Sequence, residues 1–276
     1  MDAAGLLELA RSRAPLHEQR AALATALREK GASSEAARAV LERARDGVVL
    51  YDDGEIHASR VGGNGFLPPG EDWPTGPTHK AMEFVAAIDL GEMSAPEPLP
   101  RTGTLLVYWA SENLRQDFVA GTYVRYVPRE VPLEERANPD PGVEVAAPIP
   151  LAGVTMPIYG TAGLSLPADE DFNAVSSLYR ELGELVRFSQ LLGGSRDFSI
   201  RPVVEEVAYW FKRVGFMARR RYSKEEQAGG GWTLLAQFGS NRGGLAFPED
   251  GALYLVIPDT DLRALKFDRV MGILQS

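Results

Sequence analysis

The first 46 residues repeat apolar positions with the period of an α-helix. One amphipathic face carries three leucines with alanines between them: Leu16, Leu23 and Leu27. Gly31 suits the position after the end of that helix, and Ser34 suits the N-cap of a following one. The pattern predicts an antiparallel helical pair within residues 1–46, whose apolar face covers the rest of the protein.

From Gly47 onward, apolar residues follow the period of strands. Two apolar runs, 48–51 and 56–61, flank the strong turn signal 52–54, which predicts a β-hairpin. Further strands are predicted where β-branched, aromatic and other apolar residues cluster between turn residues, at Met82–Leu90, Thr104–Trp109, Tyr123–Val127, Val143–Ile149, Trp232–Phe238, Ala252–Ile257 and Val270–Leu274. The proline-rich stretch 131–142 is expected to be a surface loop.

Helical spacing returns in the second half of the chain, after an irregular stretch up to residue 171. Apolar residues recur at this spacing over 175–186, and Gly193 is placed to end the helix, so that Leu192 belongs to its last turn. A second helix is expected after Ser199. Asp259 has the character of an N-cap before a short helical turn.

Glycines and prolines are concentrated in the segment Gly62–Trp73, which we call the glycine–proline loop. Such a composition requires unusual backbone dihedral angles and excludes both a helix and a central strand. Phe66 and Trp73 are expected to anchor the loop to a hydrophobic core. A phosphate-binding loop is disfavoured, because Phe-Leu-Pro-Pro follows the glycines where a Lys-Ser/Thr pair and a helix start would be needed.

Two parts of the sequence resemble each other. Residues 84–88 followed by 102–107 share a pattern with 234–238 followed by 250–255: an apolar strand, a connector, a glycine turn and a second apolar strand. We therefore predict an α+β fold with a duplicated antiparallel β-sheet body and an N-terminal helical hairpin. The expected divisions are a helical region over 1–46 and a body over 47–276, with pseudo-repeat halves of approximately 47–150 and 151–276.

The composition favours a cytoplasmic globular protein. The chain has 276 residues, 45% hydrophobic and 24% charged, with a net charge of −9 and no cysteine. The negative charge argues against nucleic acid as a partner. A membrane partner is not expected either, because no apolar run approaches the roughly 18 residues of a membrane span. The first residues, Met1–Ala4, lack the pattern of a signal peptide, so we expect a cytoplasmic location.

Patterns typical of catalysis or metal binding are weak. The three histidines are far apart in the sequence: His17, His57 and His79. None has the spacing to a second histidine or to carboxylates on a helix that indicates zinc. Gly163–Pro167 lacks the second glycine of a nucleophile elbow, and adjacent carboxylates such as Asp52 and Asp53 point to opposite faces in a strand. We predict no catalytic residue, metal or cofactor, and an enzyme is less expected than a binding protein.

One basic run stands out in this acidic chain: Arg219, Arg220 and Arg221. Positive charge at this point fits the end of a helix, where it offsets the partial charge of the last carbonyl groups. The same run is also a candidate contact patch for an acidic protein partner.

A set of motifs in a consistent order resembles the YwqG-like family, a bacterial family whose function is not established. The motifs are Gly62-Gly63, Leu67-Pro68, Trp73-Pro74, Phe84–Asp89, Thr102–Leu105, Gln190–Gly193, Trp232–Gln237, Asp250–Tyr254 and Phe267–Gln275. The resemblance covers roughly residues 55–276. The chain departs from the family pattern at Gly194-Ser195 and at Phe247-Pro248. The resemblance implies an α+β fold of duplicated antiparallel sheets, and the frequent position of relatives near genes for secreted toxins implies neutralisation of a partner as one role.

Two hypotheses about function follow. In the first, the protein is a cytoplasmic module that binds another protein, with an immunity-type partner of a bacterial toxin as one option. In the alternative, it is a small-ligand-binding protein or an enzyme with a pocket beside the glycine–proline loop. Candidate lining residues, chosen for their cationic, amide and aromatic side chains, are Arg60, Asn64, Trp73 and Gln237.

Overall fold

The computed structural model describes residues 1–93, 95–110, 121–140, 148–158, 166–186, 189–192, 207–209, 211, 220–239 and 251–275. Its helices are α1 (Ala3–Arg11), α2 (Leu16–Glu29), α3 (Ser34–Arg43), α4 (Leu90–Met93), α5 (Asp169–Val186), α8 (Lys224–Gln227) and α9 (Asp259–Arg263). Its strands are β1 (Arg45–Tyr51), β2 (Arg60–Val61), β3 (Gly65–Leu67), β4 (Glu83–Asp89), β5 (Thr104–Trp109), β6 (Thr122–Val127), β7 (Glu134–Arg136), β8 (Ile149–Pro150), β9 (Ala152–Ile158), β10 (Ser189–Leu192), β11 (Trp232–Gly239), β12 (Ala252–Pro258) and β13 (Met271–Gln275). This mixture of helices and antiparallel sheets confirms the predicted α+β class.

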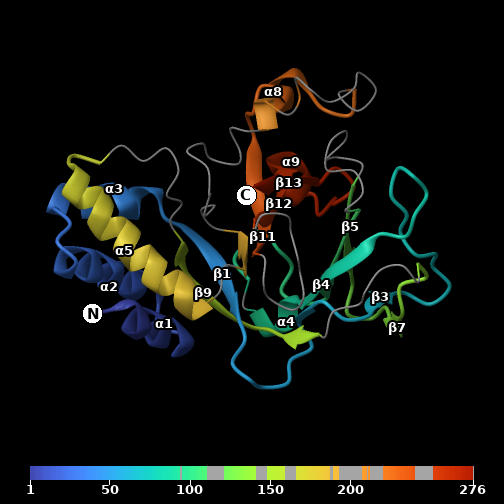
Figure 1. Cartoon of the computed structure of the whole chain (residues 1–276), viewed down its shortest axis with the longest axis horizontal. Helices are drawn as coiled ribbons and strands as arrows, with labels where there is room; N and C mark the ends of the chain where they lie inside the picture. The colour runs from blue at the N-terminus through green and yellow to red at the C-terminus, as the bar shows by residue number, and fades with distance from the viewer. Residues whose placement is uncertain are drawn as a thin grey trace.

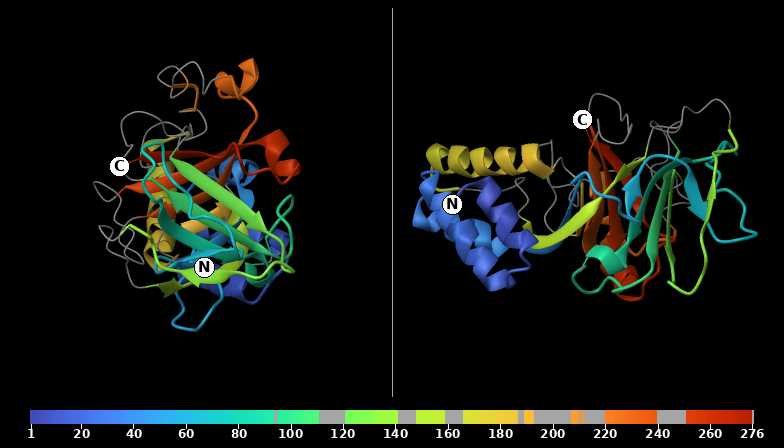
Figure 2. Two further views of the ribbon diagram at one scale, coloured as in Figure 1. Left: turned by 90° about the vertical axis from the view of Figure 1, so that its right-hand side faces the viewer. Right: turned by 90° about the horizontal axis from the view of Figure 1, so that it is seen from below.

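Two large antiparallel sheets form the body of the protein. One has the strand order β13-β12-β11-β10-β1-β9 and the other the order β6-β5-β4-β2-β8, while β3 and β7 form a small ribbon. The two large sheets face each other, and α1, α2, α3 and α5 gather at one end of the molecule (Figures 1 and 2). Between the sheets lies a hydrophobic core to which both contribute, including Ile88 and Leu105 from one and Phe238 and Leu253 from the other.

Strand β1 is buried on both of its faces. Val48 and Leu50 point into the core between the sheets, whereas Val49 and Tyr51 belong to the cluster beneath the helices. Alternate side chains of a strand point to opposite faces, so a strand between two cores needs apolar residues at every position. The run Val48–Tyr51 meets that requirement.

The predicted helical pair is present as α2 and α3, but a further helix, α1, precedes it. Asp2 caps α1 by accepting a hydrogen bond from the N–H of Gly5 at 2.9 Å. Ser33, rather than the predicted Ser34, caps α3 through a bond from the N–H of Ala36 at 3.1 Å. The N-terminal region is therefore a group of three helices.

The predicted hairpin over 48–51 and 56–61 is wrong. β1 pairs with β9 and β10, whereas β2 pairs with β4 and β8 in the other large sheet. The turn itself forms, since Asp52 Oδ1 accepts a hydrogen bond from the N–H of Gly54 at 2.9 Å. Ile56, expected in a strand, is 96% exposed. The chain crosses between sheets here because β1 satisfies both of its edges with other partners.

Four further expectations are corrected. The residues before Gly193 form strand β10 rather than the end of a helix, and the stretch expected to be irregular contains β9. Pro258, not Asp259, occupies the N-cap of α9, and the Asp259 carboxylate instead accepts a hydrogen bond from Thr233 Oγ1 at 2.5 Å. The loop 131–142 contains the short strand β7.

The other predicted elements are confirmed as β4, β5, β6, β11, β12, β13 and α5. Several expectations fall outside the described residues: most of the strand at 143–149, the stop at Gly193, and the helix start after Ser199.

The registers of the two large sheets are equivalent, which supports the duplication. Ala86 lies opposite Val107 and Ala236 lies opposite Leu255, and in each strand pair the register shifts just before that alanine, between Phe84 and Ala86 and between Leu234 and Ala236. An irregularity at matching positions of two strand pairs is a specific feature, because a bulge alters the twist and the direction of side chains.

The preceding strands match in the same way. Arg60 lies opposite Ala87 in one sheet, and Gln190 lies opposite Gln237 in the other. Strands β2, β4, β5 and β6 thus correspond to β10, β11, β12 and β13. The boundaries of the halves, 47–150 and 151–276, remain a prediction, and β1 from the first of these ranges pairs within the six-stranded sheet.

Candidate functional site

The glycine–proline loop packs against the outer face of the five-stranded sheet. Trp73 donates a hydrogen bond from Nε1 to the carbonyl of Met82 at 2.8 Å, and its ring meets Tyr108 edge-on with 5.3 Å between centroids. The Tyr108 hydroxyl donates to the carbonyl of Phe66 at 2.6 Å, and burial raises the pKa of Tyr108. A Cβ on Gly65 would lie 2.6 Å from the Trp73 ring, so only glycine fits there. Phe66 and Trp73 anchor the loop as predicted.

Arg60 and Asn64 are brought together by the structure. The Nη2 of Arg60 donates to the carbonyl of Asn64 at 3.0 Å and pairs with Glu135 at 3.0 Å, and its guanidinium lies 4.1 Å from the centroid of Phe66. Asn64 Nδ2 contacts the same Glu135 carboxylate at 3.3 Å. These contacts fasten the loop to β7, which is a structural role.

Gln237 lies apart from the other three candidates, on the six-stranded sheet. It is fully buried opposite Gln190, and its Nε2 lies 3.4 Å from the hydroxyl of Tyr254. The expected grouping of Gln237 with Arg60, Asn64 and Trp73 is therefore wrong. The sequence repeat relates β11, which carries Gln237, to β4, but these two strands belong to different sheets.

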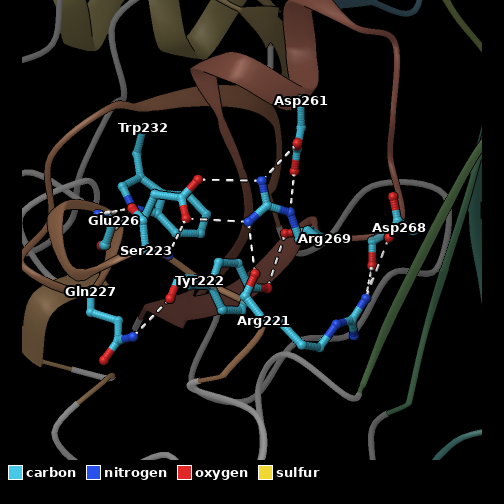
Figure 3. A network of polar contacts seen from close by, with 9 residues as sticks. All are labelled: Arg221, Tyr222, Ser223, Glu226, Gln227, Trp232, Asp261, Asp268 and Arg269. Atoms are coloured by element: carbon cyan, nitrogen blue, oxygen red, sulfur yellow. Dashed lines mark hydrogen bonds and ion pairs between the residues drawn. The ribbon is translucent and has the colours of Figure 1, made fainter.

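The basic run lies beside a network of polar contacts centred on Arg269 (Figure 3). Arg221 donates to the carbonyl of Asp268 at 2.8 Å, and Arg220 is exposed, while Arg219 falls outside the described residues. Two carboxylates hold the guanidinium of Arg269: Asp261 at 2.6 and 2.7 Å, and Glu226 at 3.2 and 3.3 Å.

This network ties α8, α9 and β13 together. Burial alone would raise the pKa of Glu226, but hydrogen bonds from the Ser223 N–H and from Arg269 outweigh it and lower that pKa. Ser223 and Glu226 form a capping box at the start of α8, and Trp232 donates to the carbonyl of Glu226 at 2.8 Å. Each charged group has a partner that explains its position, so the arrangement is structural.

A cleft of about 430 Å³ lies where the N-terminal helices meet the body. It is lined by the end of α1 and the turn that follows, by the start of α2, by the loop after β1, by α4 and by β9. The loop after β1 and the lower end of α1 are at the bottom of the view in Figure 1. Small-ligand sites typically have volumes of roughly 300–1,000 Å³, so this cleft has the size of a binding site.

Gln19, on α2, is the most buried polar residue that lines the cleft, with 5% of its surface exposed. Its Nε2 donates to the carbonyls of Ala14 at 2.8 Å and Thr155 at 3.2 Å. Both partners are acceptors, which identifies the NH₂ end of the amide. Oε1 therefore remains as a buried acceptor, with no hydrogen-bond partner in the described part of the chain.

Charged side chains also line the cleft. The guanidinium of Arg11 lies 4.5 Å from the centroid of the Tyr51 ring, and the neighbouring Arg13 forms no ion pair with any residue that the structure describes. His57 Nε2 lies 2.9 Å from Asp53 Oδ1. Burial tends to raise the pKa of Asp53, but hydrogen bonds from the Glu55 N–H and from His57 hold it below its ordinary value.

Glu92, on α4, completes the polar lining. Its carboxylate accepts hydrogen bonds from the N–H of Ala58 at 3.0 Å and from the N–H and hydroxyl of Ser59 at 3.1 and 2.9 Å. These bonds hold the loop after β1 in place. Within the described residues no group of three or more histidine, aspartate and glutamate side chains has the geometry of a metal site.

Comparison with known families decides which family the chain belongs to. Residues 59–276 match the family described as a domain of unknown function (DUF1963). The chain belongs to the DUF1963 family. No curated protein matches the sequence. In the described part of the chain no helix has the length and apolar character needed to cross a membrane.

The cleft is shared between the DUF1963 domain and the chain that precedes it. Gln19, Arg13 and Asp53 come before residue 59, whereas Glu92 and Thr155 lie inside the matched range. The DUF1963 domain therefore supplies only part of this site, and the N-terminal helices complete it.

No sequence motif marks the cleft. One local indication was present, because Gln19 falls on the face of α2 that also carries Leu23 and Ala26, and a glutamine among buried apolar positions is unusual. Its approach to Thr155 in the DUF1963 domain, 136 residues away, has no counterpart in any local pattern.

Proposed function

We propose that this protein binds a small polar molecule in the cleft between its N-terminal helices and the DUF1963 domain. The observation that carries the proposal is the cleft itself, which has a volume of about 430 Å³ and is lined by charged side chains from both structural units, among them Arg13, Asp53 and Glu92. Small-molecule sites are concave, have volumes of roughly 300–1,000 Å³ and carry a few polar groups that fix the orientation of the ligand.

The position of the cleft supports the same function. Ligand sites occur preferentially where two structural units meet, because each unit contributes part of the wall. Here β9 and the α1–α2 turn are already joined by the two hydrogen bonds of Gln19, so the walls are held in place before any ligand enters. We also propose that the chain belongs to the bacterial YwqG-like group, on the motifs given above. We propose a cytoplasmic location as well.

The test compares two alanine-to-tryptophan variants of the full chain. Ala14 lines the cleft in the α1–α2 turn, so Ala14→Trp fills the cleft with an indole ring. Ala21 is exposed on α2 and does not line the cleft, so Ala21→Trp is the matched control. Each protein is dialysed to equilibrium against a small-molecule extract of its expression host, and mass spectrometry identifies the retained compounds.

We expect a compound that is enriched at a stoichiometric level by the wild type and by Ala21→Trp, and at least tenfold less by Ala14→Trp. Circular dichroism of the three proteins would show whether all are folded. The proposal is wrong if the wild type and a folded Ala14→Trp protein retain the same compounds, or if neither enriches any.

Binding of a protein partner is a second candidate function. It is favoured by Ile56, which is 96% exposed in the same loop that supplies Asp53 and His57 to the cleft. An exposed isoleucine of this kind fits the apolar centre of a protein interface. Neutralisation of a toxin is one form of this proposal.

The test of protein binding is co-purification from native cells. Ile56→Ser should weaken the capture of a specific protein, whereas Val131→Ser, at another exposed apolar side chain, should not.

A further inference from the structure

The loop after β1, residues 52–59, has neighbouring ends. Tyr51 lies opposite Ala152 on β9, and Arg60 lies opposite Pro150 on β8. These two partners are separated by a single residue, so the chain leaves the body and returns to it at almost the same place. A compact surface segment with adjacent ends is an Ω-loop, a type of loop that frequently has a function. Figure 1 shows the loop projecting at the bottom of the molecule.

Both ends of the loop are fixed to the body. Tyr51 is the last residue of β1, and Ser59 is fully buried at the other end. The carbonyl of Ser59 accepts a hydrogen bond from the N–H of Leu151 at 2.8 Å, and Glu92 holds the N–H groups of Ala58 and Ser59. Any movement of the loop is therefore a rotation about these two attachments.

Between the attachments, residues 52–57 bond only with one another within the described part of the chain. The carboxylates of Asp52 and Asp53 accept hydrogen bonds from the N–H groups two residues further along, at 2.9 and 3.0 Å, and His57 contacts Asp53. A rotation of the whole segment keeps these internal bonds and breaks none to the described remainder of the protein. The segment can therefore move as one piece at a low cost in free energy.

Ile56 makes a movement of this loop favourable. Its side chain is 96% exposed, although isoleucine is among the residues most often buried. The cleft beside the loop is lined in part by the apolar side chains of Ala14 and Leu16, which are half-buried. Packing an isoleucine against such side chains removes apolar area from water, which contributes more than a typical surface ion pair.

We infer that the loop after β1 is a lid, which turns about its two fixed ends and closes the cleft with Ile56 packed against the α1–α2 turn. In the open arrangement of the structure, Asp53 and His57 line the cleft while Ile56 faces solvent. Closing separates a bound molecule from water and slows its release. The inference rests on the proposed function, since it names the device that controls access to the same cleft. It also competes with a protein partner as the explanation of Ile56.

The test uses pairs of introduced cysteines in the full chain, which has no cysteine of its own. Glu55→Cys marks the lid beside Ile56, and Ala14→Cys marks the opposite wall of the cleft. A disulfide forms only where the two Cα atoms approach to within about 7 Å. In the control pair, Ala21→Cys, at an exposed position of α2 outside the cleft, replaces Ala14→Cys.

Under excess oxidised glutathione, we expect the pair Ala14→Cys and Glu55→Cys to form its disulfide roughly tenfold faster than the control pair, as measured by mass spectrometry of the digested protein. Addition of Ile56→Ser should slow this reaction roughly fivefold, because the apolar contact of the closed lid is lost. Addition of Val131→Ser, at an exposed side chain of another loop, should leave the rate unchanged. Circular dichroism shows whether each variant is folded.

Each reaction is run in buffer and in the small-molecule extract of the dialysis experiment, because a ligand of the closed cleft shifts the population toward the closed state. The inference is overturned if both cysteine pairs react at the same rate in both media, or if Ile56→Ser leaves the rate unchanged.

Failure of the lid is distinct from failure of the proposed function. If dialysis yields a compound that Ala14→Trp excludes while the cysteines of lid and wall react no faster than the control pair, the cleft binds a ligand without a lid. If the disulfide forms as expected but no compound is retained, the lid is present and small-molecule binding is wrong.

Discussion

Gln19 on α2 donates a hydrogen bond to the carbonyl of Thr155 on β9, at 3.2 Å. The same NH₂ group also donates to the carbonyl of Ala14 at 2.8 Å, so one side chain joins the turn between two helices to the edge of the six-stranded sheet. This amide thus docks the N-terminal helices on the body.

The docking function predicts that Gln19→Glu destabilises the protein. A carboxylate would replace the only donor and would face two carbonyl oxygens in a buried position, so we expect a loss of about 2–3 kcal/mol at pH 7. The loss should shrink near pH 5, because a protonated acid again supplies a donor. Urea unfolding of the full chain measures both values. His17→Glu, at an exposed position of the same helix, is the control, and an equal loss in the two variants would contradict the docking role.

Arg13→Gly should make the fold more stable, because the backbone at Arg13 has a φ of 57°. Relief of the left-handed strain is worth about 1–2 kcal/mol, and the greater freedom of glycine in the unfolded chain offsets about 0.5–1 kcal/mol of it. We therefore expect a net gain of about 0.5–1 kcal/mol in the free energy of unfolding, measured by urea denaturation. A less stable Arg13→Gly protein would show that the arginine has a structural partner.

Trp73→Ala should destabilise the protein by about 3 kcal/mol, because it removes the ring that packs on Tyr108 together with the bond to the Met82 carbonyl. Trp73→Phe keeps an aromatic ring and loses only the indole N–H, so its expected cost is about 1 kcal/mol. Chemical denaturation followed by circular dichroism gives both values. Wild-type stability of Trp73→Ala would mean that the glycine–proline loop does not depend on this anchor.

The contribution of Glu226 to stability should depend on pH. Its pKa in the folded protein is lowered, so its stabilising effect is present above the pKa of the unfolded chain and is lost as the pH falls through the lower folded value. We expect Glu226→Gln to cost about 2 kcal/mol at pH 7, as for a hydrogen bond to a charged group, and much less below about pH 4. Unfolding free energies between pH 3 and pH 7 test this.

Glu225 provides the matched control, since it is exposed in the same short helix. Glu225→Gln should change stability by less than about 0.5 kcal/mol across that range. A pH-independent difference between wild type and Glu226→Gln would show that Arg269 does not rely on the charge of this carboxylate.

Local patterns predicted much of the secondary structure. The apolar run Thr104–Trp109 became β5 with the same bounds, and the turn at Asp52–Gly54 formed as its sequence indicated. Even the repeated strand pattern proved specific, since Ala86 and Ala236 occupy equivalent registers. These features depend on interactions between residues close in sequence, or on a side-chain period that a strand or helix imposes by itself.

Partner choice and the cleft were decided by the tertiary structure. The run Val48–Leu50 is equally suited to a hairpin or to the middle of a sheet, and it pairs with β9 and β10 because only there are both of its faces buried. Likewise, nothing near Gln19 in the sequence indicates Thr155 as its partner. The sequence by itself indicated most of the strands and helices, through period and turn chemistry, but not α1, β9 or the strand character of β10. Which of them meet was determined by the burial of apolar surface over the whole chain, a condition that no local stretch contains.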